Sequence, residues 1–173
     1  YNNHIGVPLS LCNLENDHKY GVFEIGMSNS GEIRKLSNLV KPNIAIITNI
    51  GEAHIENFNN LNSIAKAKSE IIENINKGGY LILNRDDKYF RYLVKLAQKR
   101  KINILSFGKS TKSNARLIKN RVHKNYNFLH FRVLNKNIHI KVKNVNFLTI
   151  YNILFVLLTL HALNLNLSKI MNF

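Results

Sequence analysis

The chain has 173 residues, which is the size of one domain and long enough to bury a substantial core. Its hydrophobic content of 45% is ordinary for a folded protein, and its single cysteine, Cys12, excludes an intramolecular disulfide framework and fits a cytoplasmic protein. The net charge of +15 is compatible with a nucleic-acid or anionic-membrane partner, but the basic residues are spread along the chain, which favours a solvated surface and anionic small substrates.

Strand-like and helix-like segments alternate over the first 107 residues. In chain order, the patterns predict a helix with its exit loop over 1–14, a buried strand over 20–25, a helix over 31–40, a strand over 44–48, a helix over 61–75, a strand over 80–83, a helix starting at Asp86, and a strand over 102–107. This alternation is typical of parallel strands joined by crossover helices. The chain is expected to begin inside a strand–helix unit, without the opening strand.

The pattern changes after Gly108. Residues 115–122, 128–134 and 138–142 alternate apolar with polar or basic side chains, and the short link over 134–138 predicts a hairpin. We therefore expect an antiparallel meander at the edge of the sheet, followed by a helix over 150–163. The apolar stretch over 150–165 is too short and too polar for a membrane span, and no signal peptide is visible.

Polar side chains follow three of the predicted strands. Glu24 ends the first, residues 48–54 with His54 follow the second, and residues 84–87 follow the third. Ligands of open α/β sheets bind beyond the carboxyl ends of the strands, and carboxylate and amide oxygens suit Mg²⁺. The alternatives are structural: Glu24 as a helix cap, His54 as a core histidine, and the acidic pair over 86–87 as caps of their own helix. Spacing alone leaves these alternatives open.

Four ordered segments carry a family resemblance. They are Asn-Asn-His-Ile-Gly-Val-Pro-Leu-Ser-Leu over 2–11, the stretch from Glu-Ile-Gly-Met to Gly-Glu-Ile over 24–33, Thr-Asn-Ile-Gly-Glu-Ala-His-Ile-Glu-Asn-Phe over 48–58, and Ala-Lys-Ala-Lys-Ser-Glu-Ile over 65–71. Together they resemble the Mur ligase family. The resemblance spans nearly the whole chain and is strongest in its first two-thirds. It implies a single central domain over 1–173 with a P-loop NTPase-like α/β fold.

The resemblance also implies a chemistry. Members of this family use ATP to phosphorylate a peptide carboxylate, an incoming amine displaces the phosphate, and Mg²⁺ ions offset the developing charge. Glu24 and His54 match the metal-binding glutamate and histidine of the family. Lys68 matches a lysine that several members carry as a carbamate, which makes it a metal ligand with a catalytic role; the alternative is an ordinary phosphate-binding or surface lysine.

The Glu-Ile-Gly and Gly-Glu-Ile elements are most similar to one branch of the family. That branch adds D-alanyl-D-alanine to UDP-N-acetylmuramoyl tripeptide in peptidoglycan precursor synthesis, so these two molecules are the implied substrates. Asn152 matches an asparagine that approaches the base and ribose of the nucleotide, with helix capping as the alternative.

Two features depart from the family pattern. No Gly-x-x-x-x-Gly-Lys-Ser/Thr phosphate loop occurs, and Gly108-Lys109-Ser110 is interpreted as a chance similarity because a strand-like stretch follows it. The family's Gly-x-His-Asn before Asn152 is replaced by Asn-Phe-Leu-Thr over 146–149. We therefore expect the phosphate-loop segment and the C-terminal domain to lie outside this chain, and the chain alone to be inactive. The alternatives are a basic nucleic-acid-binding module and a decayed, non-catalytic ligase remnant.

Overall fold

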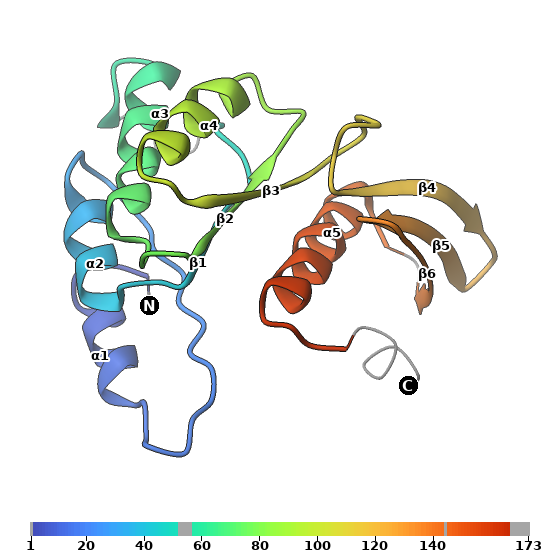
Figure 1. Ribbon diagram of the computed structural model, residues 1–173, viewed down its shortest axis with the longest axis horizontal. Helices are drawn as coiled ribbons and strands as arrows, with labels where there is room; N and C mark the ends of the chain where they lie inside the picture. Colours follow the sequence, from blue (N-terminus) through green and yellow to red (C-terminus); the bar gives the residue numbers. More distant parts are fainter. Residues whose placement is uncertain (1, 52–56, 144, 167–173) are drawn as a thin grey trace.

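The computed structural model describes residues 2–51, 57–143 and 145–166. The described elements are, in chain order, α1 (Gly6–Cys12), α2 (Glu32–Val40), β1 (Ile44–Ile47), α3 (Leu61–Ser69), the 3-10 helix η2 (Glu70–Asn74), β2 (Tyr80–Asn84), α4 (Phe90–Lys99), β3 (Asn103–Phe107), β4 (Ala115–Val122), β5 (Tyr126–Val133), β6 (Lys136–Lys143) and α5 (Phe147–Ala162). Figure 1 shows their arrangement in space.

The strands form one six-stranded sheet in the order β1-β2-β3-β4-β5-β6. β1, β2 and β3 run parallel, with Ile44 opposite Tyr80 and Tyr80 opposite Asn103. β4 joins this part through a single parallel pair, Phe107 opposite Ala115, and then pairs antiparallel with β5, as β5 does with β6. The predicted fold class is therefore confirmed, namely a mostly parallel sheet flanked by helices, with an antiparallel meander at its edge.

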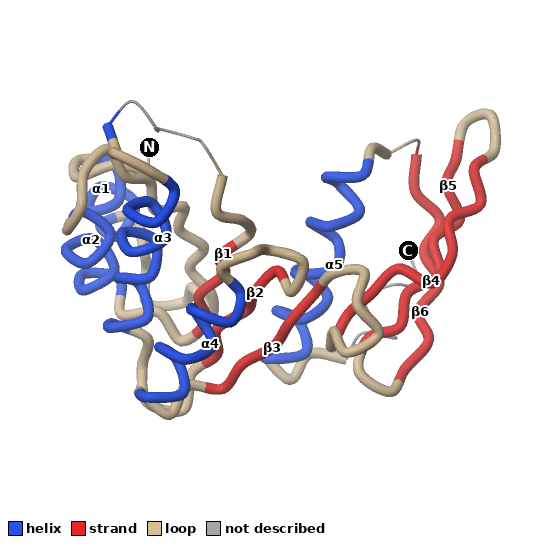
Figure 2. Tube along the Cα trace, turned by 90° about the horizontal axis from the view of Figure 1, so that it is seen from above, coloured by secondary structure: helices blue, strands red, loops and turns tan. Residues whose placement is uncertain are grey.

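The parallel strands are covered on both faces. Leu81 and Leu83 of β2 pack into a core with α2, α3 and α4, whereas Ile82 packs into a second core with α5. Figure 2 shows α5 on the opposite side of β1–β3 from α2 and α3. Burial on both faces explains why these strands read as continuous apolar runs. In the described part of the chain, no helix is long and apolar enough to cross a membrane.

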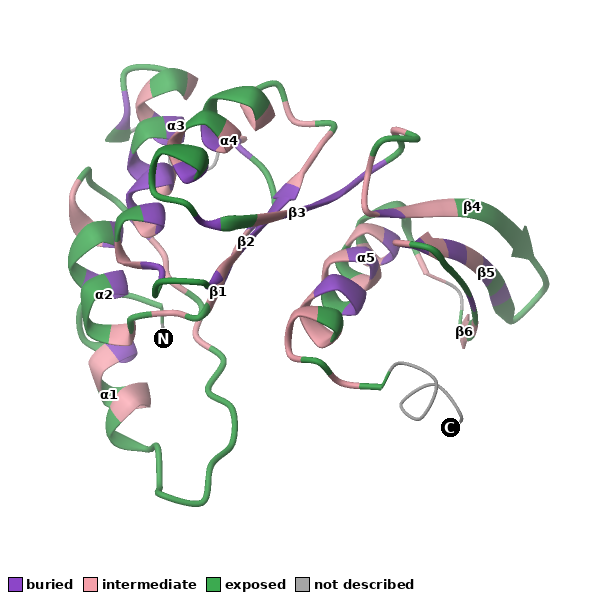
Figure 3. Ribbon diagram, in the orientation of Figure 1, coloured by how far each residue is buried: buried purple, intermediate pink, exposed green. Residues whose placement is uncertain are grey.

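The meander has only one covered face. Buried and exposed residues alternate along β5 (Figure 3), with Leu129, Phe131 and Val133 packed in the α5 core. This is the period-two pattern that the sequence showed, because side chains of a strand point alternately to its two faces.

Local side-chain caps start two of the helices. Asn60 accepts a hydrogen bond from the Ser63 N–H and starts α3, and Asn146 accepts one from the Thr149 N–H and starts α5. The final helix thus begins at Phe147, three residues earlier than the apolar pattern predicted. The predicted helix over 61–75 is confirmed, with its last turn tightened into η2.

The strand predicted over residues 20–25 is wrong. These residues have no regular secondary structure, and the side chain of Val22 is 96% exposed. Next to this segment, the Gly26 N–H donates a backbone hydrogen bond to the Asn2 carbonyl. A strand is stable only when a neighbouring strand pairs with its backbone groups, and here a cavity lies between the segment and β1.

Candidate functional site

The polar residues predicted at the carboxyl ends of the strands do lie together along one edge of the sheet, which we call the rim. Thr48 and Asn49 follow β1, Asn84 ends β2, and Gly108 follows β3. The segments after β1 and β2 are joined directly, because the Asp87 carboxylate accepts a hydrogen bond of 2.6 Å from the Ile50 N–H. His54, one of the predicted metal ligands, lies outside the described residues.

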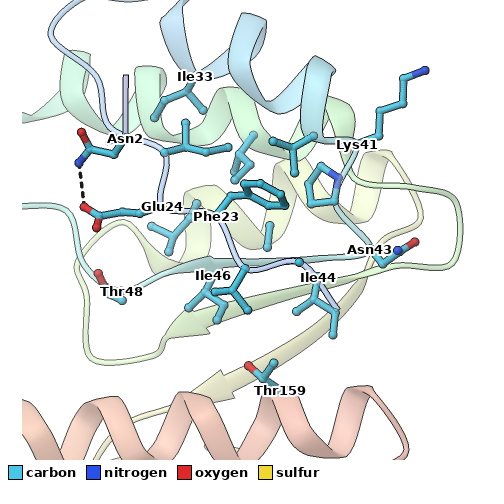
Figure 4. Close-up of a pocket in the computed structure, with 18 of the residues that line it drawn as sticks. Asn2, Phe23, Glu24, Ile33, Lys41, Asn43, Ile44, Ile46, Thr48 and Thr159 are labelled. Atoms are coloured by element: carbon cyan, nitrogen blue, oxygen red, sulfur yellow. Dashed lines mark hydrogen bonds between the residues drawn. The ribbon is translucent and has the colours of Figure 1, made fainter. Parts of the chain in front are cut away.

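A cavity of about 770 Å³ lies between residues 19–27 and β1. Asn2, Glu24, Thr48, Asn49 and Lys68 are among the residues that line it. Figure 4 shows the Glu24 carboxylate near Thr48, held by a hydrogen bond of 2.9 Å from Asn2 Nδ2. Glu24 is exposed and does not cap the following helix: the N-cap residue of α2 is Gly31. Its carboxylate is therefore available to a ligand.

Lys68 reaches the same cavity from α3. Its Nζ donates a hydrogen bond of 2.9 Å to the Asn49 carbonyl, and the side chain is half-buried. Burial lowers the pKa of the Lys68 amine below its ordinary value, and the nearby Asp87 carboxylate offsets part of that shift. The neutral amine thus forms at lower pH than in a free lysine. Lys66, two residues earlier, is fully on the exposed side of α3.

The acidic pair after β2 does not cap its helix, which corrects the structural alternative. α4 begins at Phe90, later than predicted, and its N-cap residue Tyr89 makes no side-chain capping bond. Asp87 instead links the Ile50 N–H to the Tyr89 N–H. The loop from Asn84 to Tyr89 occupies the space where a first helical turn was expected, because its carboxylates satisfy donors of neighbouring loops.

Asp86 ties three chain segments together. Its Oδ2 accepts hydrogen bonds from the Lys109 N–H, at 2.7 Å, and from the Tyr151 hydroxyl. A Cβ at Gly108 would lie 2.7 Å from Asp86 Oδ2, and Gly108 has φ +147°, so this approach requires glycine. The loop after β3 therefore continues through Lys109 into a turn and β4, which supports the interpretation that Gly108-Lys109-Ser110 is not a phosphate loop.

The hydrogen bond from Tyr151 to Asp86 predicts that this tyrosine titrates at an unusually high pH. Burial, and then the hydrogen bond to Asp86, raise the pKa of Tyr151 well above its ordinary value. Because the folded pKa is raised, this bond stabilises the fold below the unfolded pKa of about 10 and is lost only as pH rises through the folded value. We expect tyrosinate absorbance between about pH 9 and 11 to be the same in wild type and Tyr151→Phe. A smaller signal in the variant would show that Tyr151 titrates normally.

Asn152 is exposed on α5, one residue beyond Tyr151. Helix capping, the alternative role for Asn152, is wrong, because Asn146 caps α5 with a bond of 2.8 Å to the Thr149 N–H. The first turn of α5 exposes Phe147 and, to 73%, Leu148. The Tyr151–Asp86 bond brings this end of α5 to the same rim as β2.

The oxygen atoms that line the cavity are of the type that binds a hard cation. Mg²⁺ prefers oxygen ligands, takes few of them from protein, and keeps several waters. The exposed oxygens of Glu24 and Thr48 line the cavity. Within residues 2–51, 57–143 and 145–166, no three His, Cys, Asp or Glu side chains gather into a metal cluster.

Residues 28–32 form the loop that leads from the cavity to α2. Glu32 accepts hydrogen bonds from the Ser28 N–H and the Asn29 side chain, and these bonds lower the pKa of its carboxyl. Asn29 and Glu32 therefore fix the loop and the first turn of α2. Nothing in the sequence pattern distinguished this structural role from substrate contact.

Comparison with known proteins identifies the family. Residues 1–160 match the family described as Mur ligase middle domain. The UDP-N-acetylmuramoyl-tripeptide–D-alanyl-D-alanine ligase of Rickettsia prowazekii (strain Madrid E) is 41% identical over 119 residues, which cover 68% of this chain and 26% of that protein. The chain thus spans about a quarter of the length of this relative.

Solved structures share the fold. MurF from Acinetobacter baumannii superposes with a TM-score of 0.90 at 27% identity, over 98% of this chain and 37% of that chain. MurF ligase from Thermotoga maritima in complex with ADP has a TM-score of 0.77 at 24% identity, over 97% of this chain and 39% of that chain.

Proposed function

The chain belongs to the Mur ligase middle-domain family, and on that premise we propose that it is the nucleotide-binding part of an ATP-dependent ligase that joins D-alanyl-D-alanine to UDP-N-acetylmuramoyl tripeptide. The observation that carries the proposal is the 41% identity to a relative with this activity in its name. The cavity at the strand ends supports it, because Glu24, Asn49 and Lys68 meet there. The activity would serve peptidoglycan precursor synthesis in the cytoplasm.

The proposed reaction has two steps. A carboxylate oxygen of the tripeptide attacks the terminal phosphorus of ATP, and ADP leaves. The amine of D-alanyl-D-alanine then attacks the acyl carbon, so that the C–N bond forms, phosphate leaves and the amine loses a proton. Both steps require the reacting atoms of the substrates to be held in line. We propose that the loops after β1 and β2 and the start of α5 hold them in this way.

We propose that Glu24, His54 and a carbamate on Lys68 hold Mg²⁺. The ion, when bound, would offset the charge that develops on the phosphate oxygens. Lys68 suits this role because its neutral amine, favoured by burial, can attack CO₂ to give an N-carboxylate and release a proton. Asn49 holds the amine at the rim before the reaction.

We propose that Asn152 contacts the nucleotide. It is exposed at the end of α5 that Tyr151 ties to Asp86, and a relative in the same fold was solved with ADP. The Gly-x-x-x-x-Gly-Lys-Ser/Thr pattern of a phosphate loop does not occur in residues 1–173, and the chain spans 26% of the relative with this activity in its name, so we propose the activity for the full-length protein.

The test is phosphate release by the full-length product of the gene. We expect release from ATP only when Mg²⁺, UDP-N-acetylmuramoyl tripeptide and D-alanyl-D-alanine are all present, with a product mass equal to the condensed peptide. Omission of any one component should reduce the rate to background. A folded full-length protein that releases no phosphate with these substrates would contradict the proposal and favour a decayed ligase.

A further inference from the structure

The charge of this chain is divided unevenly. Residues 1–87 hold all 10 acidic residues and 8 of the 25 basic ones, whereas residues 88–173 hold the other 17 basic residues and no Asp or Glu. The basic residues are spread along the chain, but the acidic residues that could offset their charge are confined to its first half. The sequence therefore places the entire positive excess in the half that forms α4, β3, the meander and α5.

The structure gathers part of this charge on the outer face of the meander. Cross-strand register places Arg116 opposite Arg132, Lys119 opposite His130 and Arg121 opposite Phe128, all on one face of β4 and β5. On the other flank of β5, Lys141 lies opposite Phe128 and Lys143 opposite Tyr126. The six cations Arg116, Lys119, Arg121, Arg132, Lys141 and Lys143 define the basic face. The opposite face of β5 and β6 carries Leu129, Phe131 and Ile138, which pack into the α5 core.

Nothing on the described chain neutralises this face. The ion pairs among the described residues are those of Arg34 with Glu70 and Glu73, far from the meander in sequence. Arg116 lies directly opposite Arg132, and like charges in that position destabilise a sheet. Such an arrangement is stabilised when an anion covers it.

Flat ring surfaces lie between the cations. Tyr126 and Phe128 point outward from β5 and are 40% and 42% exposed. The Lys141 amine lies 4.3 Å from the centre of the Tyr126 ring and 5.6 Å from that of Phe128. The rings of His130 and His139 stack across the strands at 4.4 Å. The face thus has a row of rings along β5, between the cations of β4 and those of β6.

We propose that the basic face binds single-stranded nucleic acid. Cations on a sheet that track a phosphate backbone, with exposed rings on which unpaired bases stack, are the two features that such binding needs. Lys141 would exchange its ring contacts for a phosphate. A duplex would not use the rings, since its bases are already stacked. This inference is independent of the proposed ligase activity.

An anionic membrane fits the face less well. Membrane-surface segments are typically amphipathic helices that bury a face of Trp, Phe and Leu and carry their cations on the opposite face, whereas the cations and rings here share one face of a sheet. The exposed aliphatic residues of β4 lie off the basic face: Ile118 sits at the bulge in the β4–β5 register, and Val122 pairs with the inward-pointing Asn127. A vesicle of anionic lipid is therefore the competing ligand in the test.

The experiment measures binding of the full-length protein to a labelled 20-nucleotide single strand, to the duplex of the same sequence, and to anionic vesicles, at several salt concentrations. Three folded variants are compared with wild type. The face variant is Arg121→Gln/Lys141→Gln/Lys143→Gln, and the ring variant is Tyr126→Leu/Phe128→Leu. The charge-matched control is Lys95→Gln/Lys99→Gln/Lys101→Gln, at exposed positions of α4 and its end.

We expect the single strand to bind at least about tenfold more tightly than the duplex near physiological salt. The face variant should weaken binding at least about tenfold and reduce the slope of log affinity against log salt by about 2, since three phosphate contacts are lost. The ring variant should weaken binding by roughly tenfold with an unchanged slope, and the control by less than about threefold.

Three results would overturn the proposal. The first is an equal loss in the face and control variants, which would show attraction to net charge alone. The second is equal binding of duplex and single strand, or no effect of the ring variant. The third is tighter, ring-dependent binding of the anionic vesicles, which would assign the face to a membrane surface. Melting temperatures equal to wild type establish that each variant is folded.

Discussion

Replacing Lys68 with alanine is expected to reduce Mg²⁺-dependent ligation by the full-length protein by roughly 10²-fold or more, because the proposed carbamate would supply a metal ligand at the centre of charge development. The half-buried Lys68 amine donates a hydrogen bond to the Asn49 carbonyl, and alanine can neither make this bond nor form a carbamate. The measurement is phosphate release at saturating substrates, in buffer equilibrated with bicarbonate.

Two control variants separate the possible roles of Lys68. Lys68→Arg keeps a cation that can donate to Asn49 but cannot form a carbamate, so it should be nearly as inactive as Lys68→Ala. Lys66→Ala removes an exposed lysine from the same helix and should keep activity within about twofold of wild type. Near-normal activity of Lys68→Arg would show that only the positive charge matters.

The pH dependence follows from the direction of the pKa shift. Because burial lowers the pKa of Lys68, the fraction of neutral amine that reacts with CO₂ increases with pH from a lower starting point than in free lysine. Degassed wild-type protein should therefore regain activity when CO₂ is supplied, and at a constant concentration of dissolved CO₂ it should regain activity faster as pH rises. Lys68→Arg should show no response to bicarbonate.

Replacing Glu70 with alanine is expected to lower the free energy of unfolding by about 3 kcal/mol. The Glu70 carboxylate is 5% exposed and accepts hydrogen bonds from Gly31 N–H at 2.8 Å, Arg34 N–H at 3.0 Å and Ser30 Oγ at 3.2 Å. Gly31 has no side chain with which to cap α2, so Glu70 from η2 satisfies the first amides of that helix.

The matched control is Glu73→Ala, one helical turn away. Glu73 pairs with the Arg34 guanidinium at 2.8 Å, but 46% of its side chain is exposed, so solvent screens the pair and its loss should change stability far less. Equilibrium urea unfolding measures both variants, and hydrogen exchange of the α2 amides locates the effect. Equal destabilisation by the two variants would contradict a capping role for Glu70.

Neither the contact of Glu70 with the start of α2 nor that of Asp86 with α5 could be predicted from the sequence. Glu70 closes a contact with residues some 40 positions earlier, and Asp86 reaches Tyr151 across 65 positions. A carboxylate followed by a helix or a strand reads as a local cap, which is how the pair over 86–87 was interpreted. Sequence periodicity predicts on which face of its helix or strand a residue lies. It does not predict which distant hydrogen-bond donor will lie next to that face.

The strand predicted over residues 20–25 also shows what a side-chain pattern cannot determine. Its apolar run is compatible with a buried strand, and its polar end, Glu24, does reach the cavity beside β1. Strand formation, however, depends on a backbone partner as well as on side chains, and within the described residues this segment has none in the sheet. Side-chain pattern therefore placed Glu24 correctly without giving the conformation of its segment.

The α/β class, the parallel strands, the meander and the ordered segments that mark the Mur ligase family could all be predicted from the amino-acid sequence, because they depend on short-range periodicity and on residue identity. Three facts emerge only from the folded chain: Lys68 is half-buried against Asn49, Asn146 and not Asn152 caps α5, and six cations share one face of the meander. Those facts depend on register and burial, which arise when segments distant in sequence pack together and exclude water.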